Sequence, residues 1–185
     1  MAVACVALLW AAPAAGSVSA GADTAGLHAF RVWLDRERKG YGCDVGPAEF
    51  RNKTVAAAYP GVRFYYVLTY ARGIQPPFPN SVSLVARVDS AGAVSVLKGS
   101  APETFQLGLK RIRSAADARL DAAAVLILAM GGEARWQIAP DSITAKKKKG
   151  WLCSCQHGSE IYTSEVAFDK KGRVRSITVN TPPVP

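Results

Sequence analysis

The sequence is poor in cysteine, and after its first twenty residues it lacks a long apolar run. Four Cys in 185 residues are too few for a small fold that depends on disulfides. The longest later apolar run, residues 122–130, stops at Gly131-Gly132 and is too short to span a bilayer. With 49% hydrophobic and 20% charged residues, the composition also excludes a disordered chain, a collagen-like chain and a multi-span membrane protein.

The first twenty residues contain no charged side chain and are apolar through residue 15. Val18-Ser19-Ala20 is a small-residue sequence of the kind that signal peptidase accepts. The pattern predicts a signal peptide over residues 1–20, followed by a single globular α+β domain over residues 21–185 in the periplasm or the secreted space. An uncleaved N-terminal anchor is the alternative. No transmembrane span is expected after cleavage.

Acidic residues are also scarce, with 14 Asp and Glu against 23 Lys and Arg, and the formal net charge is +9. Residues 1–20 carry no charge, so an exported chain would keep all of it. A basic protein outside the cytoplasm meets little nucleic acid, and no nucleic-acid partner is expected. The charge favours a protein partner or an anionic component of the cell envelope. The alternative is that the positive charge serves only to keep the protein soluble.

Helical and strand patterns alternate along the chain. Residues 21–39 have apolar side chains at helical spacing, and Gly42 to Pro47, which include Cys43, read as a loop. A second helix is expected over residues 100–116, with a break near Ser114 as an option, and a third over 115–130. Strands are expected at the following residues: 62–70, 81–89, 93–98, 135–138, 143–149, 151–156, 159–169 and 173–180.

A short sequence pattern occurs in both parts of the chain. Residues 86–94 and 166–174 both carry an Asp-x-x-Gly turn, at Asp89 and at Asp169, between apolar strands. The fold class we expect is therefore α+β, with about six to eight antiparallel strands packed with two to three helices. One interpretation is two helix-plus-meander halves. The alternative is that Asp and Gly recur in hairpin turns for local reasons.

Cysteine and histidine form one unusual cluster. On a strand, Cys153 and Cys155 would share a face with Trp151, and His157 follows. In an oxidising compartment a disulfide from Cys43 to Cys153 or Cys155 is the simplest outcome, and one thiol is then left over. The alternative is a copper or zinc site made by Cys43, Cys153, Cys155 and His157. No cofactor is expected under the first interpretation.

Lys146, Lys147, Lys148 and Lys149 form a compact positive run. It could bind an anion or an acidic partner. It could also be a solvated hairpin tip or an edge strand, where Lys prevents edge-to-edge association.

No catalytic residue can be assigned. The sequence contains no G-x-S-x-G, phosphate-binding loop, G-x-G-x-x-G or H-E-x-x-H motif. A hydrolase that uses His157 with Glu160 or Glu165 remains a third interpretation. The sequence favours an exported, non-catalytic binding module that contacts an anionic partner through the face around residues 146–149, with a thiol- or metal-binding protein as the alternative.

Overall fold

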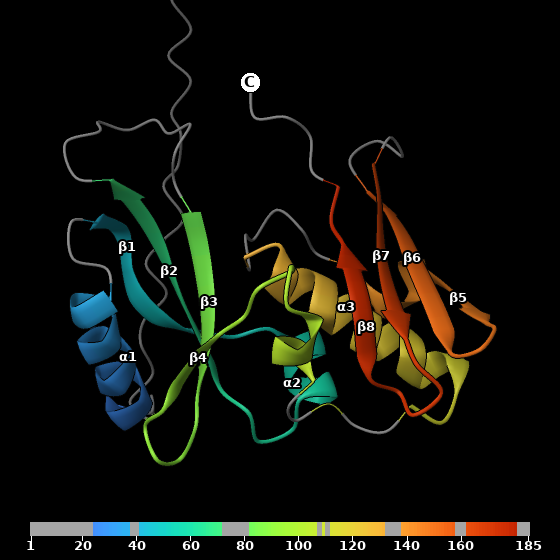
Figure 1. The fold of residues 1–185 in the computed structure, drawn as a ribbon, viewed down its shortest axis with the longest axis horizontal. Coiled ribbons are helices and arrows are strands. Elements are labelled where there is room, and N and C mark those ends of the chain that lie inside the picture. The colour runs from blue at the N-terminus through green and yellow to red at the C-terminus, as the bar shows by residue number, and fades with distance from the viewer. Residues whose placement is uncertain are drawn as a thin grey trace, which may run out of the picture.

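The computed structural model describes residues 24–37, 41–71, 82–106, 109, 112–131, 138–157 and 162–180. The side chains of residues 41–45, 69–71, 82–83, 157 and 162 lie outside this description. The fold is α+β, with two four-stranded antiparallel sheets and three α-helices, so the expected fold class is confirmed. Figure 1 shows the first sheet beside α1 and the second sheet in front of α3, with α2 between them.

Each half consists of a helix followed by a four-stranded meander. The first half contains α1 (Thr24–Glu37), β1 (Tyr41–Phe50), α2 (Lys53–Ala58), β2 (Phe64–Ala71), β3 (Val82–Val88) and β4 (Val94–Val96). The second contains the 3-10 turn η1 (Pro102–Phe105), α3 (Ala115–Ala129), the 3-10 turn η2 (Pro140–Ser142), β5 (Ile143–Lys147), β6 (Trp151–His157), β7 (Tyr162–Phe168) and β8 (Val174–Thr178). Within each sheet the strands pair in sequence order.

The third turn of each meander has the same construction. In the β3–β4 turn the Asp89 carboxylate accepts hydrogen bonds from the backbone N–H groups of Ala91 and Ala93. The Asp169 carboxylate does the same with Lys171 and Arg173 in the β7–β8 turn. Gly92 and Gly172 follow at φ +82° and +78°, a left-handed conformation that favours Gly. The interpretation as two helix-plus-meander halves is therefore confirmed at the level of the fold.

A small core lies between α1 and one face of the first sheet. Phe30 and Leu34 are on the buried face of α1, which explains the helical spacing seen in the sequence. They pack against alternate residues of β2 and β3, because residues two apart on a strand share a face. These partners are Tyr65, Val67, Leu84 and Ala86.

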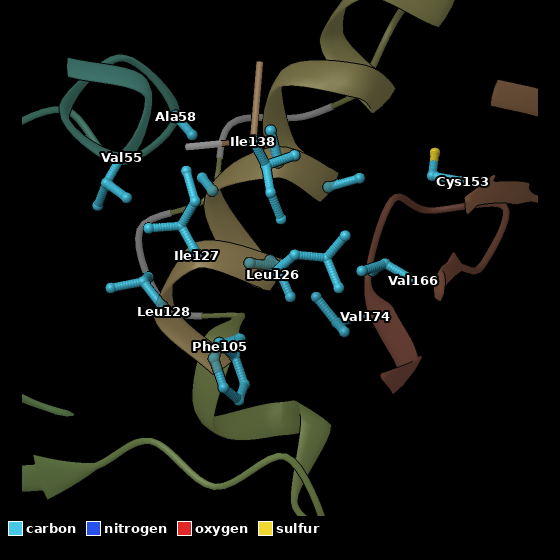
Figure 2. Close-up of a cluster of buried hydrophobic side chains, with 14 of the residues drawn as sticks. Val55, Ala58, Phe105, Leu126, Ile127, Leu128, Ile138, Cys153, Val166 and Val174 are labelled. Carbon is cyan, nitrogen blue, oxygen red and sulfur yellow. The ribbon is translucent and has the colours of Figure 1, made fainter. Parts of the chain in front are cut away.

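The main core surrounds α3. All residues of α3 from Asp121 to Leu128 are buried, as expected for a helix that is covered on every side. Figure 2 shows Val55 and Ala58 of α2 on one side of this helix and Cys153 and Val166 of the second sheet on the other. Phe64 and Val85 of the first sheet join the same cluster. The two halves therefore share their largest core.

Two parts of the chain differ from the sequence-based expectation. Residues 42–47 belong to β1, and they are not a loop. Register shifts between Cys43 and Ala48 accommodate Gly46-Pro47 inside the strand, as β-bulges do. The short helix α2 follows and was not expected; Asn52 caps it by accepting a hydrogen bond from the Val55 N–H.

The expected helix over residues 100–116 is also wrong. Among the described residues of this segment, only η1 is helical before α3 begins at Ala115. The break near Ser114 is present, because Ser114 and Asp117 form a complete capping box there. The strand expected at 135–138 falls largely outside the described residues.

Candidate functional site

The four consecutive lysines lie at the tip of the β5–β6 hairpin. Lys146 and Lys147 end β5, which is an edge strand of the second sheet, and Lys148 and Lys149 form the turn. The backbone N–H of Lys148 donates to the Gly150 carbonyl at 2.9 Å and closes this turn. All four lysine side chains are exposed. The run is thus both a hairpin tip and the end of an edge strand, the two placements that the sequence left open.

A second hairpin tip lies beside the first. In a meander, alternate turns fall at the same end of the sheet, and the pairing of Trp151 with Phe168 places the β5–β6 turn next to the β7–β8 turn. A side chain at Gly150 would collide with the carbonyl of Phe168, so the two turns approach closely at backbone level. Lys170 therefore joins the lysine run. We call Lys146–Lys149 together with Lys170 the basic tip cluster.

The basic tip cluster borders an open cavity of about 260 Å³. Lys147, Lys148, Lys149 and Lys170 line it together with Trp151 and Ile112. The ammonium group of Lys147 lies 5.7 Å from the centre of the Trp151 ring, within cation–π range. The cavity thus combines several positive charges with a small apolar wall.

The acidic residue of the cavity does not neutralise these lysines. Asp169 accepts hydrogen bonds from the backbone N–H groups of Lys171 and Arg173, at 2.8 and 2.9 Å, and pairs with the Arg173 guanidinium at 2.8 Å. These hydrogen bonds, together with the Arg173 charge, lower the pKa of Asp169 to about 2. Within the part of the chain that the structure describes, no lysine of the basic tip cluster forms an ion pair. The cluster therefore presents uncompensated positive charge to solvent.

The two cysteines of β6 share a face, as the alternation predicted. Cys153 and Cys155 are 0% and 3% exposed and pack in the main core, with half-buried Trp151 beside them. Both thiols are free. The Cys153 thiol donates to the carbonyl of Ala118 on α3 at 3.5 Å. These side chains fill the space between sheet and helix.

Burial and the nearby Asp121 carboxylate raise the pKa of the Cys153 thiol to about 12, although the Arg119 charge acts in the opposite direction. In the folded chain Cys153 is therefore held as the protonated thiol, which is a poor nucleophile. Among the side chains that the structure describes, no group of three or more His, Cys, Asp or Glu could hold a metal ion. Within the described side chains, Cys153 serves as a packing residue of the main core.

Several candidate residues lie outside the described side chains. They include Cys43 and His157, whose strands are described but whose side chains are not, and Glu160. The predicted disulfide from Cys43 stays a prediction, although its two proposed partners are free and β1 and β6 lie in different sheets (Figure 1). The metal site and the hydrolase that depend on His157 likewise stay predictions.

Lys170 was missed as a site residue by sequence reasoning. It lies in a recognisable hairpin turn, but it is 21 positions from Lys149, and nothing in the local pattern links the two turns. Lys170 could have been identified from a predicted meander topology, because consecutive antiparallel strands place alternate turns at the same end of the sheet.

No family profile, curated protein or solved structure matches the chain. None of the described helices is long and apolar enough to cross a bilayer. The proposed function therefore depends on the charged residues at the two hairpin tips.

Proposed function

We propose that this chain is an exported, non-catalytic binding protein that contacts an anionic partner through the basic tip cluster. The partner is an acidic protein or an anionic component of the cell envelope. One observation carries the proposal: two hairpins bring four exposed lysines around one cavity, with Lys146 next to them, and none of these five lysines forms an ion pair within the described residues. Held close together, these charges repel one another, and a multivalent anion relieves that repulsion.

The position of the cluster favours a reversible surface contact. Exposed lysines are strongly hydrated and make point-charge contacts, so each contributes little alone. Several acting together give an affinity that falls as salt screens the charges. The anchoring of both turns in a rigid sheet keeps the charges at one end of the molecule, which suits an extended acidic ligand.

The experiment compares two variants that lose the same charge. In the first, Lys147, Lys148 and Lys149 become Gln; in the second, Arg31, Arg36 and Lys98, which are exposed elsewhere, become Gln. Polyglutamate serves as the anionic probe, with circular dichroism to verify folding. We expect the first variant to lose at least about tenfold in affinity, equivalent to ~1.4 kcal/mol, and the second to lose much less.

Equal losses in the two variants would show that net charge alone drives binding and would overturn the surface assignment.

Export is the second part of the proposal, and it rests on the uncharged apolar run at residues 1–20. Intact mass of the protein recovered outside the cytoplasm tests it. The expected mass lacks about twenty N-terminal residues, whereas a full-length mass would contradict cleavage.

A further inference from the structure

The basic tip cluster carries charge of one sign at one end of the second sheet. Lys171 follows Lys170 in the β7–β8 turn and is exposed as well, so this end presents four exposed lysines from Lys146–Lys149 and two from the second turn. On α1, by contrast, exposed charges of both signs are mixed, and Arg36 pairs with Glu37 at 2.8 Å. The concentration of positive charge is therefore a property of the two turns.

These charges have no fixed hydrogen-bond geometry. A lysine ammonium is strongly hydrated and sits on a flexible stem, whereas the planar guanidinium of arginine forms the paired hydrogen bonds that recognise one carboxylate. The arginine of the β7–β8 turn, Arg173, is bound to Asp169 at 2.8 Å. The two turns are thus better suited to attraction by many negative groups at once than to recognition of single residues of a partner.

The two turns form a broad end that can meet a flat surface. They lie at the same end of one sheet, and the backbone of Gly150 approaches the carbonyl of Phe168 so closely that no side chain fits between them. The open cavity beside them, of about 260 Å³, is smaller than the ~300–1,000 Å³ of typical small-molecule sites. This end therefore offers a wide contact without an enclosing pocket.

A half-buried tryptophan lies among the lysines. The Trp151 ring lines the cavity beside half-buried Ile112, and the ammonium group of Lys147 lies 5.7 Å from the centre of the ring. Tryptophan is enriched at the level of lipid headgroups, because most of its ring is apolar and its N–H can donate a hydrogen bond. The combination of lysines with this ring suits the surface of a lipid bilayer.

From these features we propose that the basic tip cluster docks on an anionic lipid bilayer, whose phosphate-bearing headgroups supply the negative charge. The inference rests on the proposed function and names the anionic partner in it. Clusters of about 4–8 basic residues bind such bilayers, since each charge near the surface adds to the attraction. The contact is peripheral and electrostatic, because Val32 on α1 is the one large apolar side chain that is exposed among the described residues.

Co-sedimentation of the full chain with vesicles tests the proposal. The anionic vesicles contain phosphatidylcholine with about 30% phosphatidylglycerol, and the neutral vesicles contain phosphatidylcholine alone. We expect the protein to bind the anionic vesicles at least about tenfold more tightly than the neutral ones. Raising the salt from about 0.1 M to about 1 M should release it, because the screening length falls from ~10 Å to ~3 Å.

Variants of each turn locate the contact. The variant with Gln at positions 147–149 should bind anionic vesicles at least about tenfold more weakly, and Lys170→Gln/Lys171→Gln at least about fivefold more weakly. The control variant of the polyglutamate experiment loses three charges elsewhere and should bind nearly as the native protein does. Circular dichroism verifies that each variant is folded.

Polyglutamate, titrated in parallel, separates this inference from the proposed function. If the native protein binds polyglutamate through residues 147–149 but binds no anionic vesicle, the bilayer is rejected and an acidic protein is left as the partner. If it binds neither probe, both proposals fail. Equal binding to the two vesicle types, an equal loss in the control variant, or an unchanged affinity in Lys170→Gln/Lys171→Gln would also overturn the docking proposal.

Discussion

A single carboxylate holds the second hairpin tip in shape. Asp169 accepts from two backbone N–H groups of its own turn and from the Arg173 side chain. The same turn contributes Lys170 to the basic tip cluster. Asp169 thus holds the turn that carries Lys170, and its pKa of about 2 keeps it ionised at neutral pH.

The lowered pKa predicts the pH range over which Asp169 stabilises the fold. A carboxyl with a depressed folded-state pKa stabilises the fold above its unfolded-state pKa, about 3.9, and this stabilisation disappears as the pH falls toward 2. Asp169→Asn should therefore lower the free energy of unfolding at pH 7, and the difference from the native protein should close between about pH 4 and pH 2. Urea unfolding at pH 7, 4 and 2 measures this.

Asp141 provides the matched control for this variant. It is exposed in η2 and makes no hydrogen bond or ion pair within the described residues. Asp141→Asn should leave the free energy of unfolding nearly unchanged at every pH. A constant difference between Asp169→Asn and the native protein across the whole pH range would contradict the assigned role.

Among the helices, the ones with a strong local signal were predictable. Apolar spacing located α1, and the Ala-rich composition located α3. The six residues of α2 are too few to show the helical spacing of apolar side chains. Gly46-Pro47 is a dipeptide typical of turns, but here it lies inside β1. In the segment before α3, Ser100 and Glu103 have the spacing of a capping box in the sequence, yet the N-cap of η1 is Ala101 and has no side-chain hydrogen bond. A short local motif was therefore not enough to predict a long helix in this segment.

The start of α3 depends on the Ser114 cap. The Ser114 hydroxyl accepts from the Asp117 N–H at 3.1 Å, and the Asp117 carboxylate accepts from the Ser114 N–H at 3.0 Å. Ser114→Ala should lower the free energy of unfolding by about 1 kcal/mol. Ser100→Ala should change it by less than about 0.5 kcal/mol. Denaturant titration of both variants gives the comparison, and a larger loss for Ser100→Ala would refute this account of the helix start.

The two halves are alike in topology, but they are not separate in packing. The cluster around α3 includes Val55 and Phe64 from the first half together with Val166 and Val174 from the second. Removing either half would expose this core. The molecule should therefore unfold as one cooperative unit, although the turn pattern repeated at Asp89 and Asp169 could suggest two independent domains.

Tryptophans in the two halves make this cooperativity measurable. Trp33 packs with the α1 core and Trp151 with the main core. Variants in which either Trp33 or Trp151 is the one remaining tryptophan, with Trp10 and Trp136 also replaced by Phe, should show the same unfolding midpoint by fluorescence. Midpoints that differ beyond the change caused by the substitutions themselves would show that the halves unfold separately.

Part of the candidate site could be predicted from the sequence. The run at Lys146–Lys149 is visible without a structure, and so is its hairpin context. Its extension to Lys170 depends on which turns the sheet brings together. The short helix α2 between β1 and β2 has no sequence signal of its own. Contacts between distant segments are therefore what sequence reasoning missed.

Titration of the folded protein with polyglutamate, followed by amide chemical shifts, locates the surface that the anion contacts. If this surface is the basic tip cluster, the shifts concentrate at residues 146–150 and 170–172, where the two tips lie together, and salt reverses them. In the variant with Gln at positions 147–149 they should largely disappear. Shifts that spread evenly over both halves, or that cluster at residues 49–64, would contradict the assignment of the basic tip cluster as the binding surface.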